Sequence, residues 1–142
     1  MKEESLSEFN DSLKEIMPFF SYLLEEYEFK IEEKIYDPKH FGNFVITLIG
    51  DFQVRFIKDR GQIFVDVKPS IGINDWFDLR IVLEFLKQDE KISFMGTDLK
   101  ELGFQLKVNY ENIKTLFKSE NYSILKGKLE EFRRKGAKKL FE

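Results

Sequence analysis

The residues that could do chemistry gather in one stretch, FIKDRGQIFVDV, at positions 56–67. Its centre, Asp59-Arg60-Gly61, sets a carboxylate beside a guanidinium, and Asp66 adds a second acid. Two carboxylates are enough for acid-base hydrolysis when they flank a substrate. A hairpin explains the same residues without any chemistry, because Gly61 can adopt the positive φ that a tight turn needs. We favour the hairpin interpretation.

The alternation of apolar residues on the two sides of this turn predicts how the strands pair. A loop of even length aligns the two apolar rows, and it sets Arg55 opposite Asp66 and Ile57 opposite Phe64. A loop of odd length would mix apolar and charged residues on each face. We therefore predict the even register, with Arg55 and Asp66 forming a cross-strand pair worth about 0.2–1 kcal/mol.

Other kinds of chemistry find little support in the residue types. His40 is the only histidine and has no ligand-spaced partners, and the chain contains no cysteine. Phosphate-binding glycine motifs are absent. We predict no metal, no cofactor and no catalytic residues, and hence a protein that is not an enzyme. The alternative is a small enzyme with its site near Arg55, Asp59 and Asp66.

The elements that must position these residues follow a simple order. Apolar spacing of three and four predicts a helix from about Leu6 to Tyr27, which Pro18 should kink or split. Strands are expected at residues 28–36, 44–50, 52–58 and 62–68, with antiparallel pairing because the connections are short. The first of these strands alternates imperfectly.

Helices should follow the sheet. One begins with Asn74 or Asp75 as its cap, a long one runs from Asp98 despite Gly103, and a last one starts near Tyr122. A short extended piece is expected at residues 91–96. The predicted fold is a single α+β domain, residues 1–142: an N-terminal helix, a four-stranded antiparallel meander, then two or three helices packed on the sheet.

Two features of the sequence are not explained by a purely structural role. The second face of the hairpin carries Ile57 and Phe64, so either helices cover both faces or an apolar patch rimmed by charge is exposed. Such a patch would serve a partner or a second copy of the chain. Trp76 stands beside Phe77 and could anchor a partner, although we expect it to pack on the core.

Charge is unevenly distributed along the chain, whose net charge is −3. Residues 1–33 hold ten acids and three bases, and residues 126–139 hold seven bases and two acids. The basic end could bind nucleic acid, but cations also suit a helix C-terminus, and we favour that explanation. No signal peptide or membrane span is evident, so we expect a cytoplasmic protein with no membrane partner.

Residues 42–87, a meander ending in DRGQIFVDV followed by a Pro/Gly turn and WFDLRIVLEFL, resemble small bacterial proteins of the polymorphic-toxin immunity type. The resemblance implies a non-enzymatic protein that masks a toxin, and it carries over no functional residue. Our expectation is a cytosolic protein-binding module. The residues expected at the partner surface are Arg55, Ile57, Phe64, Asp66 and Trp76, and an acidic face (Glu25, Glu26, Glu28, Glu32, Glu33) would attract a basic toxin.

Overall fold

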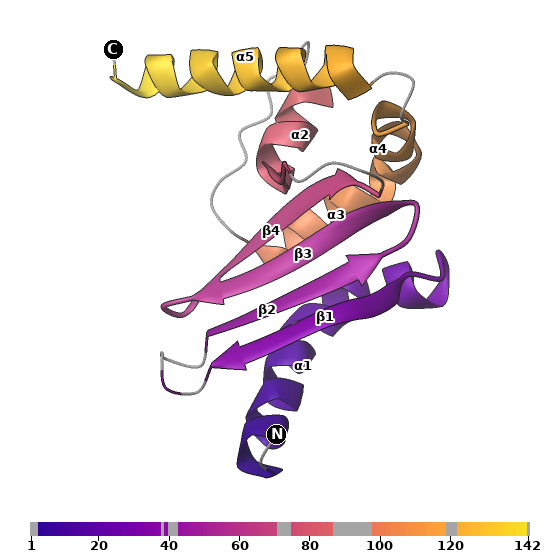
Figure 1. Ribbon diagram of the computed structural model, residues 1–142, viewed down its shortest axis with the longest axis vertical. Helices are drawn as coiled ribbons and strands as arrows, with labels where there is room; N and C mark the ends of the chain where they lie inside the picture. Colours follow the sequence, from indigo (N-terminus) through magenta and orange to yellow (C-terminus); the bar gives the residue numbers. More distant parts are fainter. Residues whose placement is uncertain are drawn as a thin grey trace.

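The computed structural model describes residues 3–37, 39, 43–70, 75–86, 98–118 and 122–141. It has an α+β fold with an N-terminal helix, an antiparallel sheet and C-terminal helices (Figure 1), which confirms the predicted class. The elements are α1 (Glu3–Glu25), β1 (Lys30–Asp37), β2 (Asn43–Ile49), β3 (Phe52–Asp59), β4 (Gln62–Pro69), β5 (Phe77–Asp78), α2 (Leu79–Leu86), α3 (Leu99–Val108), α4 (Tyr110–Leu116) and α5 (Tyr122–Phe141). His40 and the extended piece expected at 91–96 lie outside the described residues.

The sheet holds the four predicted strands as a meander and adds one more, in the order β1-β2-β3-β4-β5. The extra strand, β5, pairs antiparallel with β4 through Asp66–Asp78 and Val67–Phe77. This pairing corrects two expectations, the strand count and a helix that already includes Phe77 and Asp78. Helix α2 begins instead at Leu79, after β5 has paired with β4.

The start of α2 is capped by Asp78 and not by Asp75, and Asn74, the other predicted cap, lies outside the described residues. The Asp78 carboxylate accepts a hydrogen bond from the Arg80 backbone N–H at 2.9 Å, which satisfies one of the free donors of the first turn. Asp75 instead forms an ion pair with Lys126 of α5 at 2.7 Å. The predicted cap at Asp75 was therefore wrong.

The β3–β4 hairpin has the predicted even register. Arg55 pairs with Asp66 and Ile57 with Phe64, and the turn residues Arg60 and Gly61 both have positive φ, 53° and 83°. A two-residue loop with positive φ at both positions is a type I′ turn, whose twist matches that of the flanking strands. The charged centre of the opening stretch is thus a turn.

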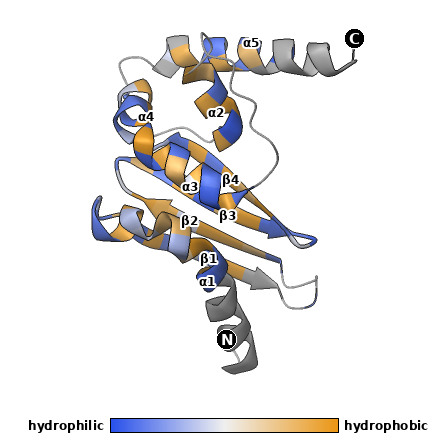
Figure 2. Cartoon of the chain, turned by 180° about the vertical axis from the view of Figure 1, so that it is seen from behind, coloured by the Kyte–Doolittle hydropathy of each residue, from blue (hydrophilic) through white to orange (hydrophobic). Residues whose placement is uncertain are grey.

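The core lies on one side of the sheet, between the strands and helices α1 and α3. Figure 2, seen from behind, shows these two helices crossing the sheet. Rings fill the layer: Phe20 of α1 meets Phe56 edge-on at 4.9 Å, and Tyr27 stacks on Tyr110 at 3.6 Å. Burial of such rings supplies much of the driving force for folding.

Helices α1 and α3 pack closely because Gly103 has no side chain. A Cβ there would lie 2.5 Å from the Phe19 carbonyl oxygen, and the Tyr22 hydroxyl donates to the Gly103 carbonyl at 2.7 Å. Helix α1 continues through Pro18, so of the two predicted outcomes, a kink or a split, the split was wrong and the kink stays a prediction.

The long helix expected from Asp98 is two helices, because α3 ends at Asn109. The side chain of Asn109 donates to the Gln105 carbonyl at 2.9 Å and its backbone leaves helical geometry. The last helix starts at Tyr122 as predicted, and Phe132 of that helix packs on Phe85 of α2 at 5.8 Å. Four helices therefore follow the sheet in the described residues, against the two or three expected.

Candidate functional site

The sheet face opposite the helices is the candidate functional surface, here named the open face. In Figure 1 it is turned toward the viewer, and none of the described helices crosses it. Its residues alternate along β2, β3 and β4 with those that enter the core. They are Val45, Thr47, Ile49, Gln53, Arg55, Ile57, Phe64, Asp66 and Lys68, and all except Thr47 are partly exposed.

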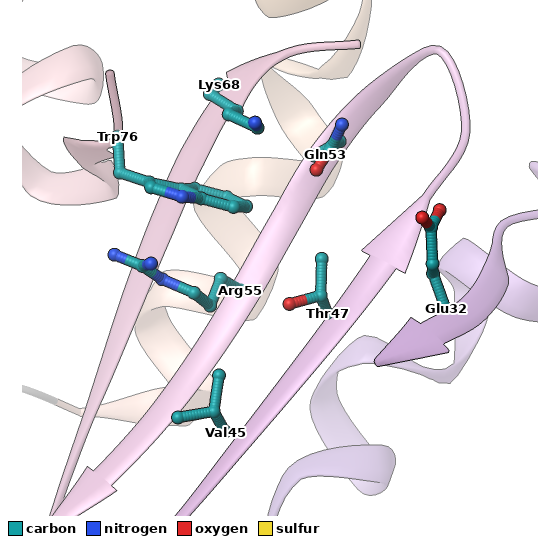
Figure 3. Close-up of a pocket in the computed structure, with 7 residues that line it drawn as sticks. All are labelled: Glu32, Val45, Thr47, Gln53, Arg55, Lys68 and Trp76. Carbon is teal, nitrogen blue, oxygen red and sulfur yellow. The ribbon is translucent and has the colours of Figure 1, made fainter. Parts of the chain in front are cut away.

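Arg55 stands at the centre of the open face. Its Nη2 donates to Asp66 Oδ2 at 2.9 Å, and its guanidinium carbon lies 4.2 Å from the centroid of the Trp76 ring. The Lys68 ammonium lies 5.0 Å from the same ring. Figure 3 shows Arg55 and Lys68 on opposite sides of Trp76. Two cation–π contacts therefore hold the indole in place over the sheet.

A row of charges continues from Arg55 across β4 and β5. Asp66 lies opposite Asp78, and Asp78 Oδ2 accepts a hydrogen bond from Arg80 at 2.8 Å. Burial raises the pKa of Asp66 above its ordinary value, although the hydrogen bond and charge of Arg55 act against this. The hydrogen bond to Asp78 raises the pKa of Arg80. Each carboxylate of the row has its own guanidinium, which is typical of structural ion pairs.

A hollow of about 310 Å³ lies on the open face beside Trp76 (Figure 3). Its lining comes from all four long strands and from the segment before β5. These residues are Glu32, Val45, Thr47, Gln53, Arg55, Lys68 and Trp76. The hollow combines cations on one side, a carboxylate on the other and uncharged hydrogen-bonding groups between them.

The structure brings the five sequence-predicted residues to one side of the sheet. The expectation that Trp76 packs on the core was wrong, because Phe77 enters the core with 3% exposure while Trp76 contacts Arg55 and Lys68. Successive residues of an extended segment point to opposite faces, so only one of these two rings can enter the core. The sequence analysis placed residue 76 in a helix, and a helix does not point neighbouring side chains to opposite faces as an extended segment does.

The three residues of the alternative enzyme site, Arg55, Asp59 and Asp66, do not all come together. Asp59 stands four residues beyond Arg55 on the same strand, a separation of roughly 14 Å at 3.4 Å per residue. Its carboxylate accepts a hydrogen bond from the Asn43 side chain at 3.4 Å, beside the turn. Arg55 and Asp66 meet, and Asp59 belongs to the end of the hairpin.

Sequence reasoning did not single out four of the lining residues, Val45, Thr47, Gln53 and Lys68, and it named Glu32 only as part of the acidic face. Glu32 lies at a β-bulge, where the register slips between Ile31 and Glu33. The imperfect alternation of the first strand was the available signal. A bulge adds an unpaired residue and re-aims its side chain.

The charged segments at the two ends of the sequence are partly tied into the fold. In the acidic segment, Glu26 forms an ion pair with Lys107 of α3 at 3.7 Å. In the basic segment, Lys126 is bound to Asp75. Both contacts give these charges a role in joining elements of the fold.

Comparison with known proteins found no matching family model, no matching curated protein and no matching solved structure. Within the described ranges, no three His, Cys, Asp or Glu side chains are grouped closely enough to hold a metal ion. Among the described helices, none combines the length and apolar character needed to cross a membrane.

Proposed function

We propose that this chain is a non-enzymatic protein-binding module whose partner docks on the open face. The observation that carries the proposal is that Ile57 and Phe64 lie side by side and partly exposed on a sheet face that no described helix covers. An apolar patch rimmed by charge is typical of interaction sites. Arg55, Asp66 and Trp76 supply the rim, and Arg and Trp are enriched among residues that dominate binding energy.

The rigidity of the rim supports the same proposal. Ordering flexible side chains costs about 0.5–1.5 kcal/mol each on binding. Arg55 and Trp76 are already held by each other, by Asp66 and by Lys68, so little of that cost remains. Covering the neighbouring apolar side chains then contributes about 25 cal/mol for each Å² removed from water.

A more specific form of the proposal is a cytoplasmic immunity protein that masks a bacterial toxin. Its support is the resemblance of residues 42–87, and the acidic N-terminal quarter would speed encounter with a basic toxin. Isothermal titration against the toxin-like product of a neighbouring gene tests it. Absence of binding, or of any such gene, would remove the immunity form and leave the binding module standing.

Site-specific photo-crosslinking in the native host tests the binding module itself. A photoreactive phenylalanine analogue replaces Phe64 on the open face or, as a matched control, Phe104 on α3, which is 60% exposed. We expect a discrete adduct from position 64 and none of the same mass from position 104. An adduct of twice the chain mass would identify the partner as a second copy. Equal labelling from both positions, or none, contradicts the proposal.

A further inference from the structure

We propose that the open face binds the open face of a second copy of this chain, sheet against sheet, about a two-fold axis that runs across the strands. The inference rests on the proposed function, because it names the occupant of the same surface. Two observations carry it: a line of apolar residues that crosses four strands, and polar residues on either side of that line that become complementary under the two-fold symmetry.

The strand registers place four apolar side chains in one line across the open face. Each pairs with the next from β1 to β4, and together they are named the apolar row: Ile35, Val45, Ile57 and Phe64. Ile35, on the edge strand, is 53% exposed, and the other three are half-buried. The four strands lie side by side in Figure 1, so the row is continuous. An exposed apolar line of this kind is typical of an interaction site.

A two-fold axis along the apolar row sets each of its members against the same residue of the second copy. The strands of the two copies then run antiparallel to each other, which is the aligned class of sheet packing, with the sheets about 10 Å apart. A residue two positions beyond the row on a strand faces the residue two positions before the row on the same strand of the second copy. Every such contact occurs twice, as in any isologous dimer.

This symmetry brings complementary groups together on β3 and β4. On β3, Arg55 faces Asp59 of the second copy, which is exposed. Arg55 holds Asp66 through Nη2, and a guanidinium has five N–H donors, so it can also donate to a second carboxylate. On β4, Asp66 faces Gln62 of the second copy, an exposed amide that can donate to it. Complementary pairs of this kind favour one arrangement of an interface over others.

A two-fold axis along the strands would not produce this match. That axis sets β1 against β4 and β2 against β3 of the second copy. Lys30 and Lys68 lie in one row of the sheet, because the pairings run from Lys30 through Ile49 and Gln53 to Lys68. The strand axis therefore places Lys30 against Lys68 of the second copy, and like charges in contact disfavour that arrangement.

Pairing of two β1 edges is also disfavoured. The β1 edge is interrupted by the bulge between Ile31 and Glu33, and it carries Lys30 and Lys34. Bulges and lysines are features by which edge strands avoid pairing with other chains. The apolar row, and not the sheet edge, is therefore the surface that suits a second copy.

The size of the open face predicts a weak dimer. Four strands and residues 62–68 span roughly 19 Å by 24 Å, at 4.8 Å per strand and 3.4 Å per residue. The footprint is roughly 450 Å² per copy, or about 900 Å² for the pair, below the 1,200 Å² at which stable specific interfaces begin. We therefore expect a dissociation constant on the order of 10–100 μM.

Sedimentation equilibrium of the purified chain from about 5 to 500 μM tests the dimer, and two isoleucines of β1 test its surface. Ile35→Lys on the open face should weaken the dimer at least about tenfold. Ile31 is 37% exposed and pairs with Leu48 of the core, so it points to the helix side of the same strand. Ile31→Lys should leave the affinity within about twofold. A wild-type monomer at every concentration, or equal weakening by both variants, overturns the proposal.

Asp59→Lys tests the direction of the axis. It places a cation against Arg55 of the second copy and should weaken the dimer about tenfold. Glu101→Lys on α3 makes the same change of net charge away from the open face and should leave the affinity within about twofold. Both positions are exposed, and far-UV circular dichroism confirms that both variants fold. Wild-type affinity in Asp59→Lys overturns the axis along the apolar row.

Sedimentation and crosslinking together separate this inference from the proposed function. A chain that stays monomeric, with a discrete adduct from position 64 that is not twice the chain mass, overturns the second copy and leaves the open face as a surface for another protein. A dimer that Ile35→Lys disrupts, with an adduct of twice the chain mass, supports both.

Discussion

Arg55 and Asp66 face each other across β3 and β4, and the guanidinium donates to the carboxylate at 2.9 Å. The two side chains are 26% and 18% exposed, so the pair is shielded from much of the solvent. Trp76 lies over the same guanidinium. This pair forms the rigid polar centre of the open face, beside the apolar residues that we propose a partner covers.

The strength of the Arg55–Asp66 pair is measurable by a double-mutant cycle. Arg55→Met keeps the aliphatic stem under Trp76, and Asp66→Asn keeps the shape of the carboxylate. We expect a coupling of about 1 kcal/mol in the free energy of unfolding from urea denaturation, the upper part of the range for cross-strand pairs. Strictly additive effects would show that the pair contributes nothing to stability.

Asp66 should also make stability depend on pH in a defined direction. Burial raises its pKa in the folded protein, so the folded state holds the proton more tightly than the unfolded chain. Ionisation of Asp66 therefore lowers the free energy of unfolding as pH rises from about 3.9, the unfolded value, through the raised pKa. Urea denaturation of wild type and Asp66→Asn across that range should show the wild type losing stability relative to the variant. A relative gain would mean that Arg55 outweighs burial.

Gly103 and Gly127 are a matched pair of helical glycines with opposite expected effects. Gly103→Ala forces its Cβ against the Phe19 carbonyl and should destabilise the fold by about 1–3 kcal/mol. Gly127→Ala meets nothing within 4 Å and should stabilise α5 by about 0.8 kcal/mol. Thermal or urea unfolding of both variants checks the signs. Equal effects would mean that α1 and α3 do not pack at Gly103.

The type I′ turn predicts a second pair of opposite effects. Arg60 holds φ at 53°, a conformation that Asn adopts at lower cost, so Arg60→Asn should stabilise the protein by about 0.5–1 kcal/mol. Gly61→Ala should destabilise it by about 1 kcal/mol through backbone strain alone, since nothing lies within 4 Å of the new Cβ. Denaturation curves with the opposite ranking would contradict the turn.

The hairpin register could be predicted because both strands alternate and only one pairing keeps their faces separate. The start of α2 could not, because WFD carries helix-compatible residues and what decides its conformation is pairing of Asp78 with Asp66. The break at Asn109 also escaped prediction, since the apolar stripe continues through it while its side chain caps the Gln105 carbonyl. The spacing of apolar residues indicates which face of a helix is buried. It does not indicate where a local hydrogen bond ends the helix.

The candidate site was likewise predictable from the sequence only in part. Arg55, Ile57, Phe64 and Asp66 were placed on one face by register alone. Trp76 lies on that face because the next two residues form β5. A strand of two residues is too short to be predicted from alternating apolar and polar residues. Glu32 depended on a bulge, whose position is decided by pairing with β2 and not by β1 itself.

The most direct test of the open face compares two neighbouring residues of β4. Ile63 enters the core with 8% exposure, and Phe64 lies on the open face. We predict that Phe64→Lys keeps a cooperative unfolding transition and abolishes the adduct formed from a photoreactive residue at Ile57, whereas Ile63→Lys unfolds the chain. If Phe64→Lys unfolds the protein as Ile63→Lys does, the open face is part of the core and the proposed docking surface is wrong.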